Sequence, residues 1–150
     1  MTRGDLLLLV AVLAAFGIAD STYLTWQWYE AATATWCDLD SYFSCTKVRE
    51  SPWSAVAGIP TATVGTGGFT ILLGLSVAGL RGRTSLGPWP ADRWLLAFAS
   101  IGVVVGASLT LVEIFVIQAV CILCLLGFGI GLAAFGAAIP LVRFTGARVS

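Results

Sequence analysis

The chain contains no histidine, and few of its side chains carry a charge. Lys, Arg, Asp and Glu together make up 11% of the 150 residues, whereas hydrophobic residues make up 58%. An average soluble domain carries about 25% charged residues, so this chain has too few to cover a water-facing surface. Without histidine it also lacks the usual general base and the commonest metal ligand. These absences exclude an ordinary soluble domain and indicate a membrane protein.

An excess of positive charge is also missing. Eight basic residues balance eight acidic residues, and the formal net charge is zero. Proteins that bind nucleic acid need a basic surface that neutralises phosphates. We therefore expect no nucleic-acid partner, and we expect the lipid bilayer to surround most of the chain.

Long apolar runs define the expected architecture. A helix needs about 20 apolar residues to cross a bilayer. Four such spans fit the sequence, at residues 6–29, 61–80, 94–115 and 119–142. The last two come from one nearly uncharged run, which must hold two helices joined by a tight turn near residues 115–119. The expected fold is an all-α, integral membrane four-helix bundle that forms a single domain over residues 1–150.

The basic residues predict how the bundle is oriented. Positive side chains collect on the cytoplasmic side of membrane proteins. Six of the eight lie before the first span, between the second and third, or after the fourth: Arg3, Arg81, Arg83, Arg93, Arg143 and Arg148. Both termini are therefore expected in the cytoplasm, with one long loop, residues 30–60, facing outward. A cleavable signal peptide is the alternative for the first span, and it leaves the downstream orientation unchanged.

Four cysteines fall into two pairs. Cys37 and Cys45 lie in the outer loop, and Cys121 and Cys124 form a Cys-x-x-Cys motif at the start of the last span. The expected topology places both pairs at the oxidising side of the membrane. On a helix the two positions of the motif share one face, and the helix N-terminus stabilises a reactive thiolate. Cys124 should lie about 4–5 Å deeper than Cys121, nearer to a lipid-soluble reactant.

Other interpretations of the cysteines remain open. The loop pair could be a structural disulfide, and the Cys-x-x-Cys pair could consist of inert packing residues. A zinc site from all four is the weakest alternative, because the loop spacing does not match zinc modules. Redox work by both pairs together is favoured, and no metal is expected.

Three other polar or turn-rich positions carry expectations. Ser51 could be the N-cap of a short helix that begins at Pro52. Asp20 and Glu113 are ionisable groups near span ends, and we expect them to reach the interface or cap a helix. Residues 81–93 are expected to be a plain, turn-rich connector between spans.

The order of these motifs resembles that of the vitamin K epoxide reductase family, in its prokaryotic branch. The shared features are four spans, the loop cysteine pair, a Ser-x-Trp motif, a Gly-Ile-Pro entry to the second span, and Cys-x-x-Cys at the last span. Here these are Cys37, Cys45, Ser51, Trp53, Gly58, Ile59, Pro60, Cys121 and Cys124. The DsbB type of quinone-linked thiol oxidase has its two cysteine pairs in the reverse order.

The resemblance implies two-electron exchange between thiols and a membrane quinone of the menaquinone, ubiquinone or vitamin K type, in support of disulfide formation. Cys37 would receive electrons from a thioredoxin-like protein and pass them to Cys45. Cys121 would rest in a disulfide with Cys124 and exchange with Cys45, and Cys124 would react with the quinone. Many bacterial relatives carry a fused thioredoxin-like domain, whereas this chain ends at Ser150 without one. The expected partner is therefore a separate exported dithiol protein.

Ser51, Thr61 and Phe128 are the residues that the resemblance places near the quinone. Ser51 matches the family's loop Ser or Thr, and Thr61 is the nearest match to an asparagine of the vertebrate members. Phe128 stands where those members have tyrosine, and it cannot donate a hydrogen bond, so the quinone carbonyls would be held differently. The expected location is the prokaryotic cytoplasmic membrane, with the active site on the periplasmic side. A non-enzymatic membrane scaffold with a structural loop disulfide is the alternative function.

Overall fold

The described residues form four long helices, in a computed structural model that covers residues 1–30, 36–83 and 85–149. The helices are α1 (Arg3–Glu30), α3 (Thr61–Leu80), α4 (Ala91–Val112) and α5 (Ile122–Val149). A π-helical turn, η2 (Glu113–Ile117), continues α4. By length and apolar composition all four can cross a membrane. The prediction of a helical membrane bundle with four spans is confirmed.

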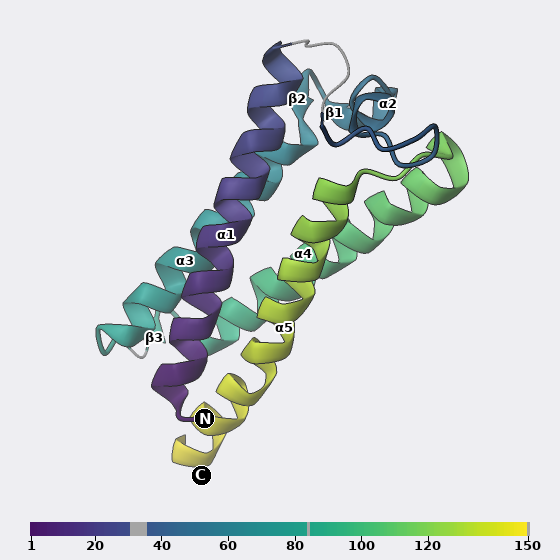
Figure 1. Cartoon of the computed structure of the whole chain (residues 1–150). Helices are drawn as coiled ribbons and strands as arrows, with labels where there is room; N and C mark the ends of the chain where they lie inside the picture. Colours follow the sequence, from purple (N-terminus) through teal and green to yellow (C-terminus); the bar gives the residue numbers. More distant parts are fainter. Residues whose placement is uncertain (31–35, 84, 150) are drawn as a thin grey trace.

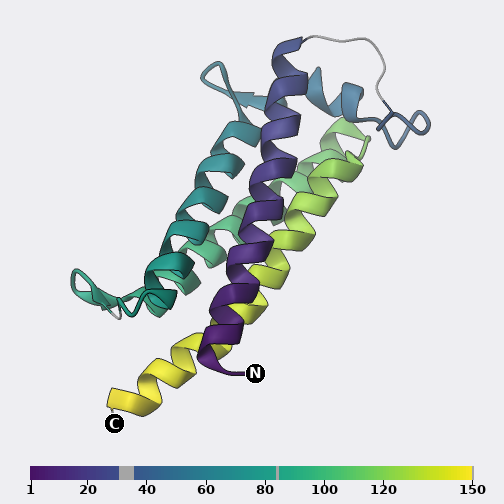
Figure 2. The ribbon, with the colours of Figure 1, turned by 60° about the vertical axis from the view of Figure 1, so that its left-hand side comes forward.

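The bundle has two distinct ends. Figure 1 and Figure 2 show both termini at one end, together with the hairpin of β3 (Ser85–Leu86) and β4 (Trp89–Pro90). We call this the terminal end. The opposite, loop end carries the short helix α2 (Cys45–Arg49), the 3₁₀ turn η1 (Pro52–Ser54), and the hairpin of β1 (Ala55–Val56) and β2 (Ile59–Pro60).

Small and aliphatic side chains fill the core between the helices. The main buried cluster contains Leu7, Val10, Ala14, Leu72, Leu95, Ala99, Ala134 and Leu141, which come from all four long helices. The outward faces are apolar as well, since Phe16, Val104 and Leu126 are exposed. An apolar exterior suits lipid, and helices satisfy their own backbone hydrogen bonds there. The first helix therefore contributes to the core like the other three.

A buried ion pair ties three helices together at the terminal end. Arg3 Nε and Nη2 donate to the two carboxylate oxygens of Asp92 at 3.0 and 2.9 Å. The Thr145 hydroxyl donates to the same carboxylate. These contacts join α1, α4 and α5, and the Asp92 side chain is almost completely buried.

A two-residue hairpin precedes each of α3 and α4. In the first, Ala57 and Gly58 both have positive φ, as a type I′ turn requires. In the second, Gly87 has φ +67° and Pro88 follows, in the Gly-first pattern of a type II′ turn. The turn-rich connector expected over residues 81–93 thus contains a hairpin, whose two short strands were not predicted. Two strands of two residues each show too little alternation to be recognised in a sequence.

Candidate active site

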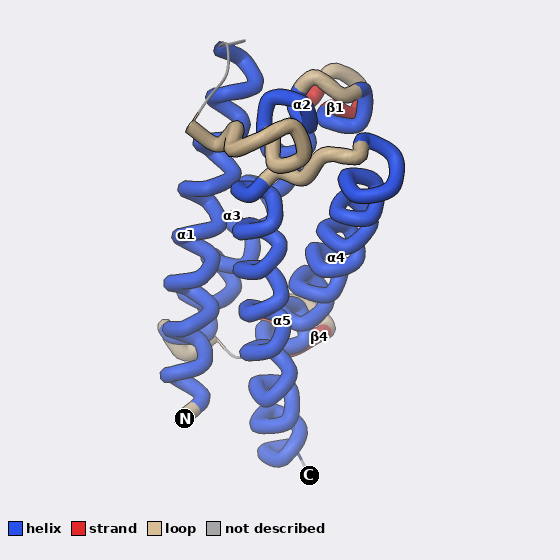
Figure 3. The backbone as a smooth tube through the Cα atoms, turned by 45° about the vertical axis from the view of Figure 1, so that its right-hand side comes forward, coloured by secondary structure: helices blue, strands red, loops and turns tan. Residues whose placement is uncertain are grey.

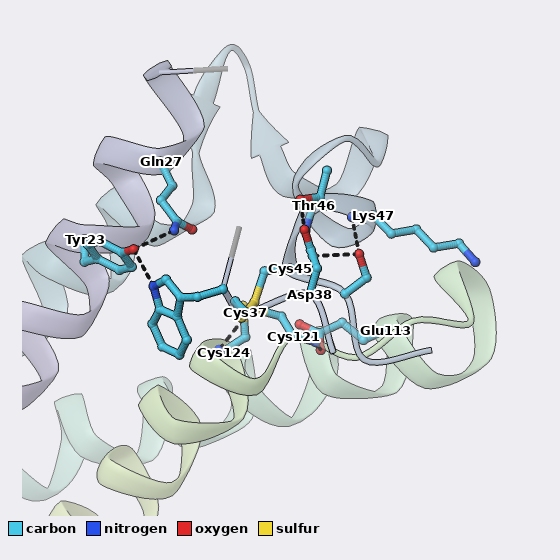
Figure 4. Close-up of a disulfide and its surroundings, with 12 residues drawn as sticks. Tyr23, Gln27, Cys37, Asp38, Cys45, Thr46, Lys47, Glu113, Cys121 and Cys124 are labelled. Carbon is cyan, nitrogen blue, oxygen red and sulfur yellow. Dashed lines mark hydrogen bonds between the residues drawn. A yellow bond between two sulfur atoms is a disulfide. The ribbon is translucent and has the colours of Figure 1, made fainter. Parts of the chain in front are cut away.

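One acidic side chain braces the segment that carries the loop cysteines. Asp38 Oδ1 accepts hydrogen bonds from the Ser44 hydroxyl at 2.9 Å and the Thr46 N–H at 3.0 Å, and its Oδ2 accepts from the Thr46 hydroxyl at 2.5 Å. Ser44 is itself the N-cap of α2. These bonds link the residue after Cys37 to the turn that begins with Cys45 (Figure 4).

An isolated β-bridge joins this segment to the turn before α5. Phe43 and Val120 form an isolated parallel bridge, in which the Val120 N–H donates to the Tyr42 carbonyl at 2.8 Å. The loop drawn in tan in Figure 3 thus lies across the loop end of the bundle. Two residues beyond Phe43 comes Cys45, and one beyond Val120 comes Cys121. The bridge therefore brings the two cysteine pairs together.

A sharp break between η2 and α5 positions Cys121. Gln118 takes a left-handed conformation with φ 56° and ψ 34°, which reverses the chain after η2. The Cys121 N–H then donates to Glu113 Oε2 at 3.2 Å. Cys121 Sγ accepts the Cys124 N–H at 3.3 Å, as a residue at the start of a helix does when it caps the first turn. Glu113 thus caps a backbone group, as expected, although it is buried.

Three sulfur atoms meet at this point. Cys37 and Cys45 form a disulfide, and Cys121 and Cys124 are free thiols. Cys45 Sγ lies 3.1 Å from Cys121 Sγ, and both residues are buried (Figure 4). Exchange between a thiol and a disulfide proceeds by attack of one sulfur on another. The arrangement can therefore pass a disulfide between the loop pair and the Cys-x-x-Cys pair.

The same sulfur atoms do not make a typical metal site. Within the described part of the chain, the sulfurs of Cys37, Cys45 and Cys121 lie within 4.8 Å of one another. Two of the three are joined in a disulfide and cannot serve as thiolate ligands. Structural zinc sites use four ligands in a tetrahedral arrangement.

An apolar cavity of about 460 Å³ lies next to the sulfurs, between the four long helices. The cysteines in its wall are Cys45, Cys121 and Cys124, whereas Cys37 reaches it only through its disulfide to Cys45. Ser51, Thr61 and Phe128 also line it. Cavities of a few hundred Å³ with mainly apolar walls are typical binding sites for small molecules.

The three supporting residues have distinct local contacts. Ser51 is at the N-cap position of η1, but its side chain makes no capping bond, and its hydroxyl donates to the Val48 carbonyl at 2.7 Å. The expected capping role of the Ser51 side chain is therefore wrong. The Thr61 hydroxyl donates to the Ser54 carbonyl at 3.1 Å.

Phe128 packs its ring directly against the backbone of α4. A Cβ placed on Gly106 would lie 2.5 Å from this ring, so only glycine leaves the ring enough room. The contact fixes Phe128 in the wall of the cavity and gives that wall an apolar aromatic face.

One side of the cavity is open to the exterior of the bundle. Val64 on α3, and Ile101 and Val105 on α4, line the cavity and are also exposed. These two helices are membrane-spanning, so the opening between them faces lipid. A ligand can thus reach the cavity from the bilayer.

The sequence matches the profile of the Vitamin K epoxide reductase family over residues 8–139, which is most of the chain. The chain belongs to this family. A comparison with curated proteins finds no match. Family membership and the four spanning helices identify a multi-pass membrane protein, an oxidoreductase of the vitamin K epoxide reductase type.

The sequence did not predict the structural roles of several residues around the site. The Tyr23 hydroxyl accepts hydrogen bonds from Gln27 Nε2 at 2.8 Å and Trp36 Nε1 at 2.7 Å, which ties the residue before Cys37 to α1 (Figure 4). Asp38, which braces the loop, could have been recognised only as an acidic residue beside a cysteine.

Outside the membrane spans, one carboxylate organises the tip of the loop. Asp40 Oδ1 accepts the N–H groups of Phe43 at 2.7 Å and Tyr42 at 2.8 Å. These two backbone bonds hold the pKa of the Asp40 carboxyl below its usual value, because they stabilise the charged form. The charged form of Asp40 therefore keeps both hydrogen bonds in the turn that presents Phe43 to Val120.

Proposed function

We propose that this chain is a membrane thiol:quinone oxidoreductase that oxidises a thioredoxin-like dithiol protein and reduces a membrane quinone. The observation that carries the proposal is the 3.1 Å separation between Cys45 Sγ and Cys121 Sγ. It links a disulfide in the loop to a thiol pair beside an apolar cavity. Residues 1–150 act together as one transmembrane domain.

The proposed electron path runs from the loop pair to the Cys-x-x-Cys pair. The donor's two thiols reduce the disulfide between Cys37 and Cys45 and become a disulfide themselves. Cys45 then exchanges with Cys121, which moves the electrons to Cys121 and Cys124. The structure corresponds to the state in which the loop pair is oxidised and the second pair is reduced. In this state the second pair is ready to give two electrons to a quinone.

The lining of the cavity supports the binding of a quinone head group. Its walls are mainly apolar, Cys124 lies in them, and Phe128 adds an aromatic face. A quinone supplies the acceptor for two electrons and two protons when bound there. The opening between α3 and α4 would leave room for a hydrocarbon tail in the lipid.

The proposed location is a prokaryotic cytoplasmic membrane, with the cysteines on the periplasmic side. Both termini lie at the end opposite to the cysteines (Figure 1), and six of the eight basic residues belong to that end by sequence. Positive side chains favour the cytoplasmic side. An exported donor, separate from this chain, would have to reach the buried disulfide between Cys37 and Cys45 from the periplasmic side.

The decisive experiment is anaerobic quinone reduction by the purified protein in detergent. Reduced thioredoxin-like protein is the donor, and menaquinone and ubiquinone analogues are the acceptors. We expect rapid loss of quinone absorbance that depends on the donor and disappears in Cys124→Ser. Ser108→Ala serves as the control for a small change at a residue outside the cavity, and it should retain full activity. A folded wild-type protein without turnover on any of these substrates would favour the membrane scaffold.

A further inference from the structure

Asp20 is a half-buried residue, and its two carboxyl oxygens are the only shielded side-chain polar atoms among the described residues that lack a hydrogen-bond partner. Both carboxyl oxygens are shielded from solvent, and neither accepts nor donates a hydrogen bond. The expectation that this group reaches the interface is therefore wrong. An ionised carboxylate without a partner is very costly in an apolar interior, and buried polar groups are nearly always paired. The unpaired and shielded position of this carboxyl is explained if Asp20 is a neutral carboxylic acid whose hydrogen-bond partner is a bound ligand.

The position of Asp20 indicates where such a ligand would bind. Asp20 lies on α1 and lines the same cavity as Cys124. A Cβ placed on Gly127 of α5 would lie 2.9 Å from Asp20 Oδ2, so the carboxyl packs against the backbone at that residue. Gly127 is three residues beyond Cys124, which corresponds to about 4–5 Å along the helix. A molecule that fills this part of the cavity contacts the Cys124 sulfur and the Asp20 carboxyl together.

Three other hydroxyl groups in the cavity wall are already engaged. The hydroxyls of Ser51, Thr61 and Thr110 each donate to a backbone carbonyl. The oxygens of a quinone can only accept hydrogen bonds, so they need donors. A protonated Asp20 supplies one donor, and its own oxygens have no competing partner.

We propose that Asp20 holds a proton in the resting protein, donates a hydrogen bond to a quinone oxygen, and transfers this proton during reduction. The inference rests on the proposed function and names the proton donor for it. Oxidation of the Cys121 and Cys124 dithiol to a disulfide releases two electrons and two protons. Reduction of a quinone to a hydroquinone consumes both. Asp20 gives one proton to the quinone oxygen and regains one from the thiols, so the carboxyl is not consumed.

Other titratable groups line the same cavity. Cys121 and Cys124 face it at the start of α5, Glu113 faces it from η2, and Arg49 faces it from α2. Helix α3 contributes none. Glu113 is distinguished from Asp20 because its carboxylate accepts the Cys121 N–H and so holds the start of α5. Arg49 donates to the Gln27 carbonyl at 3.4 Å.

The first test compares Asp20 variants in quinone reduction and quinone binding. Asp20→Asn keeps a hydrogen-bond donor but has no acidic proton, so we expect nearly normal binding of a short-chain menaquinone analogue and turnover roughly 100-fold lower. Asp20→Leu removes the donor as well, so binding should also weaken about tenfold. Asp20→Glu restores an acid and should recover turnover above that of Asp20→Asn. Asp5→Asn, the same change at an exposed site on α1, is the matched control and should behave as wild type.

The second test observes the proton without turnover. In the Cys124→Ser protein, infrared difference spectra recorded on addition of the menaquinone analogue should show a shifted carboxylic acid C=O band. The band should be missing in Cys124→Ser/Asp20→Asn. Identical spectra from the two proteins would overturn the assignment, and so would wild-type turnover in Asp20→Asn. If wild-type protein reduces no quinone, the proposed function fails instead, whereas a shifted band would still support the hydrogen bond from Asp20.

Discussion

Cys121 uses one sulfur atom for two contacts. Its Sγ accepts the Cys124 N–H at 3.3 Å and lies 3.1 Å from Cys45 Sγ. The sulfur that faces the disulfide is thus held by the helix that it caps, and its approach to Cys45 does not depend on a flexible side chain.

This contact predicts that a mixed disulfide can be trapped. Attack of Cys121 on Cys45 releases Cys37 and forms a mixed disulfide. The Cys37 thiol can reverse this step, and the Cys124 thiol can resolve the mixed disulfide. In Cys37→Ser/Cys124→Ser both are removed, so we expect mild oxidation to give a stable bond between Cys45 and Cys121. Non-reducing proteolysis followed by mass spectrometry identifies the linked peptides.

The matched control for the trap is Cys37→Ser/Cys121→Ser, which also keeps two cysteines. Its remaining pair, Cys45 and Cys124, should form far less of the linked product under the same oxidation. Equal yields in the two double variants would contradict the importance of the observed contact, because any two nearby thiols would then suffice.

Glu113 allows a second prediction at the residue scale. Its Oε2 accepts the buried Cys121 N–H at 3.2 Å. Glu113→Ala leaves this donor without a partner, so the free energy of unfolding should fall by about 1–3 kcal/mol. Glu113→Gln keeps an oxygen acceptor and should cost clearly less. Denaturant unfolding in detergent measures both, and equal losses would argue against the hydrogen bond as the cause.

At the scale of elements, the carboxylate of Asp92 joins α1, α4 and α5. Removal of Asp92 leaves the partly exposed Arg3 without its hydrogen-bonded partner, and the loss of such bonds to a charged group typically costs about 1.5–3 kcal/mol. We therefore expect Asp92→Ala to lower the free energy of unfolding by about that amount. Thermal unfolding in detergent gives the ranking.

Two controls isolate the Asp92 effect. Arg93→Ala, at the exposed neighbouring position, should change stability by less than about 0.5 kcal/mol. Arg3→Ala/Asp92→Ala should cost less than the sum of its single variants, because the two side chains share one interaction. Additive losses would show that the pair contributes little as a unit.

The long helices and the short helix that begins at Pro52 were predictable from the sequence, whereas the two hairpins were not. A spanning helix needs only an apolar run of sufficient length, and this signal is strong over 20 residues. The hairpin at 85–90 and the left-handed Gln118 depend on a few residues each. The bridge between Phe43 and Val120 depends on tertiary contact, which no local pattern reports.

The candidate site was predictable in its residue types and only partly in its geometry. Two cysteine pairs on one side of a membrane already indicated redox chemistry. The direct contact between Cys45 and Cys121 was expected through the family resemblance, because spacing alone leaves the pairing open. Asp20 illustrates the remaining gap. A charged residue near a span end is usually solvated, and only the packing against Gly127 shows that this one is enclosed.

At the scale of the whole molecule, the bundle divides its tasks between its two ends. The terminal end is closed by the Arg3 and Asp92 ion pair. The loop end carries the cysteines, and three of them line the cavity between the long helices. The membrane-spanning helices therefore serve both as an anchor and as the wall of the cavity.

The opening between α3 and α4 determines which substrate concentration governs binding. Val64, Ile101 and Val105 border the cavity and face the lipid. A substrate that arrives by this route is partitioned into the bilayer before it is bound. Its effective abundance is a ratio of molecules to lipid, not an amount per litre. Added empty vesicles or micelles dilute the substrate within the membrane phase. They therefore lower the amount of substrate bound to the protein, although the total amount of substrate in the sample stays constant.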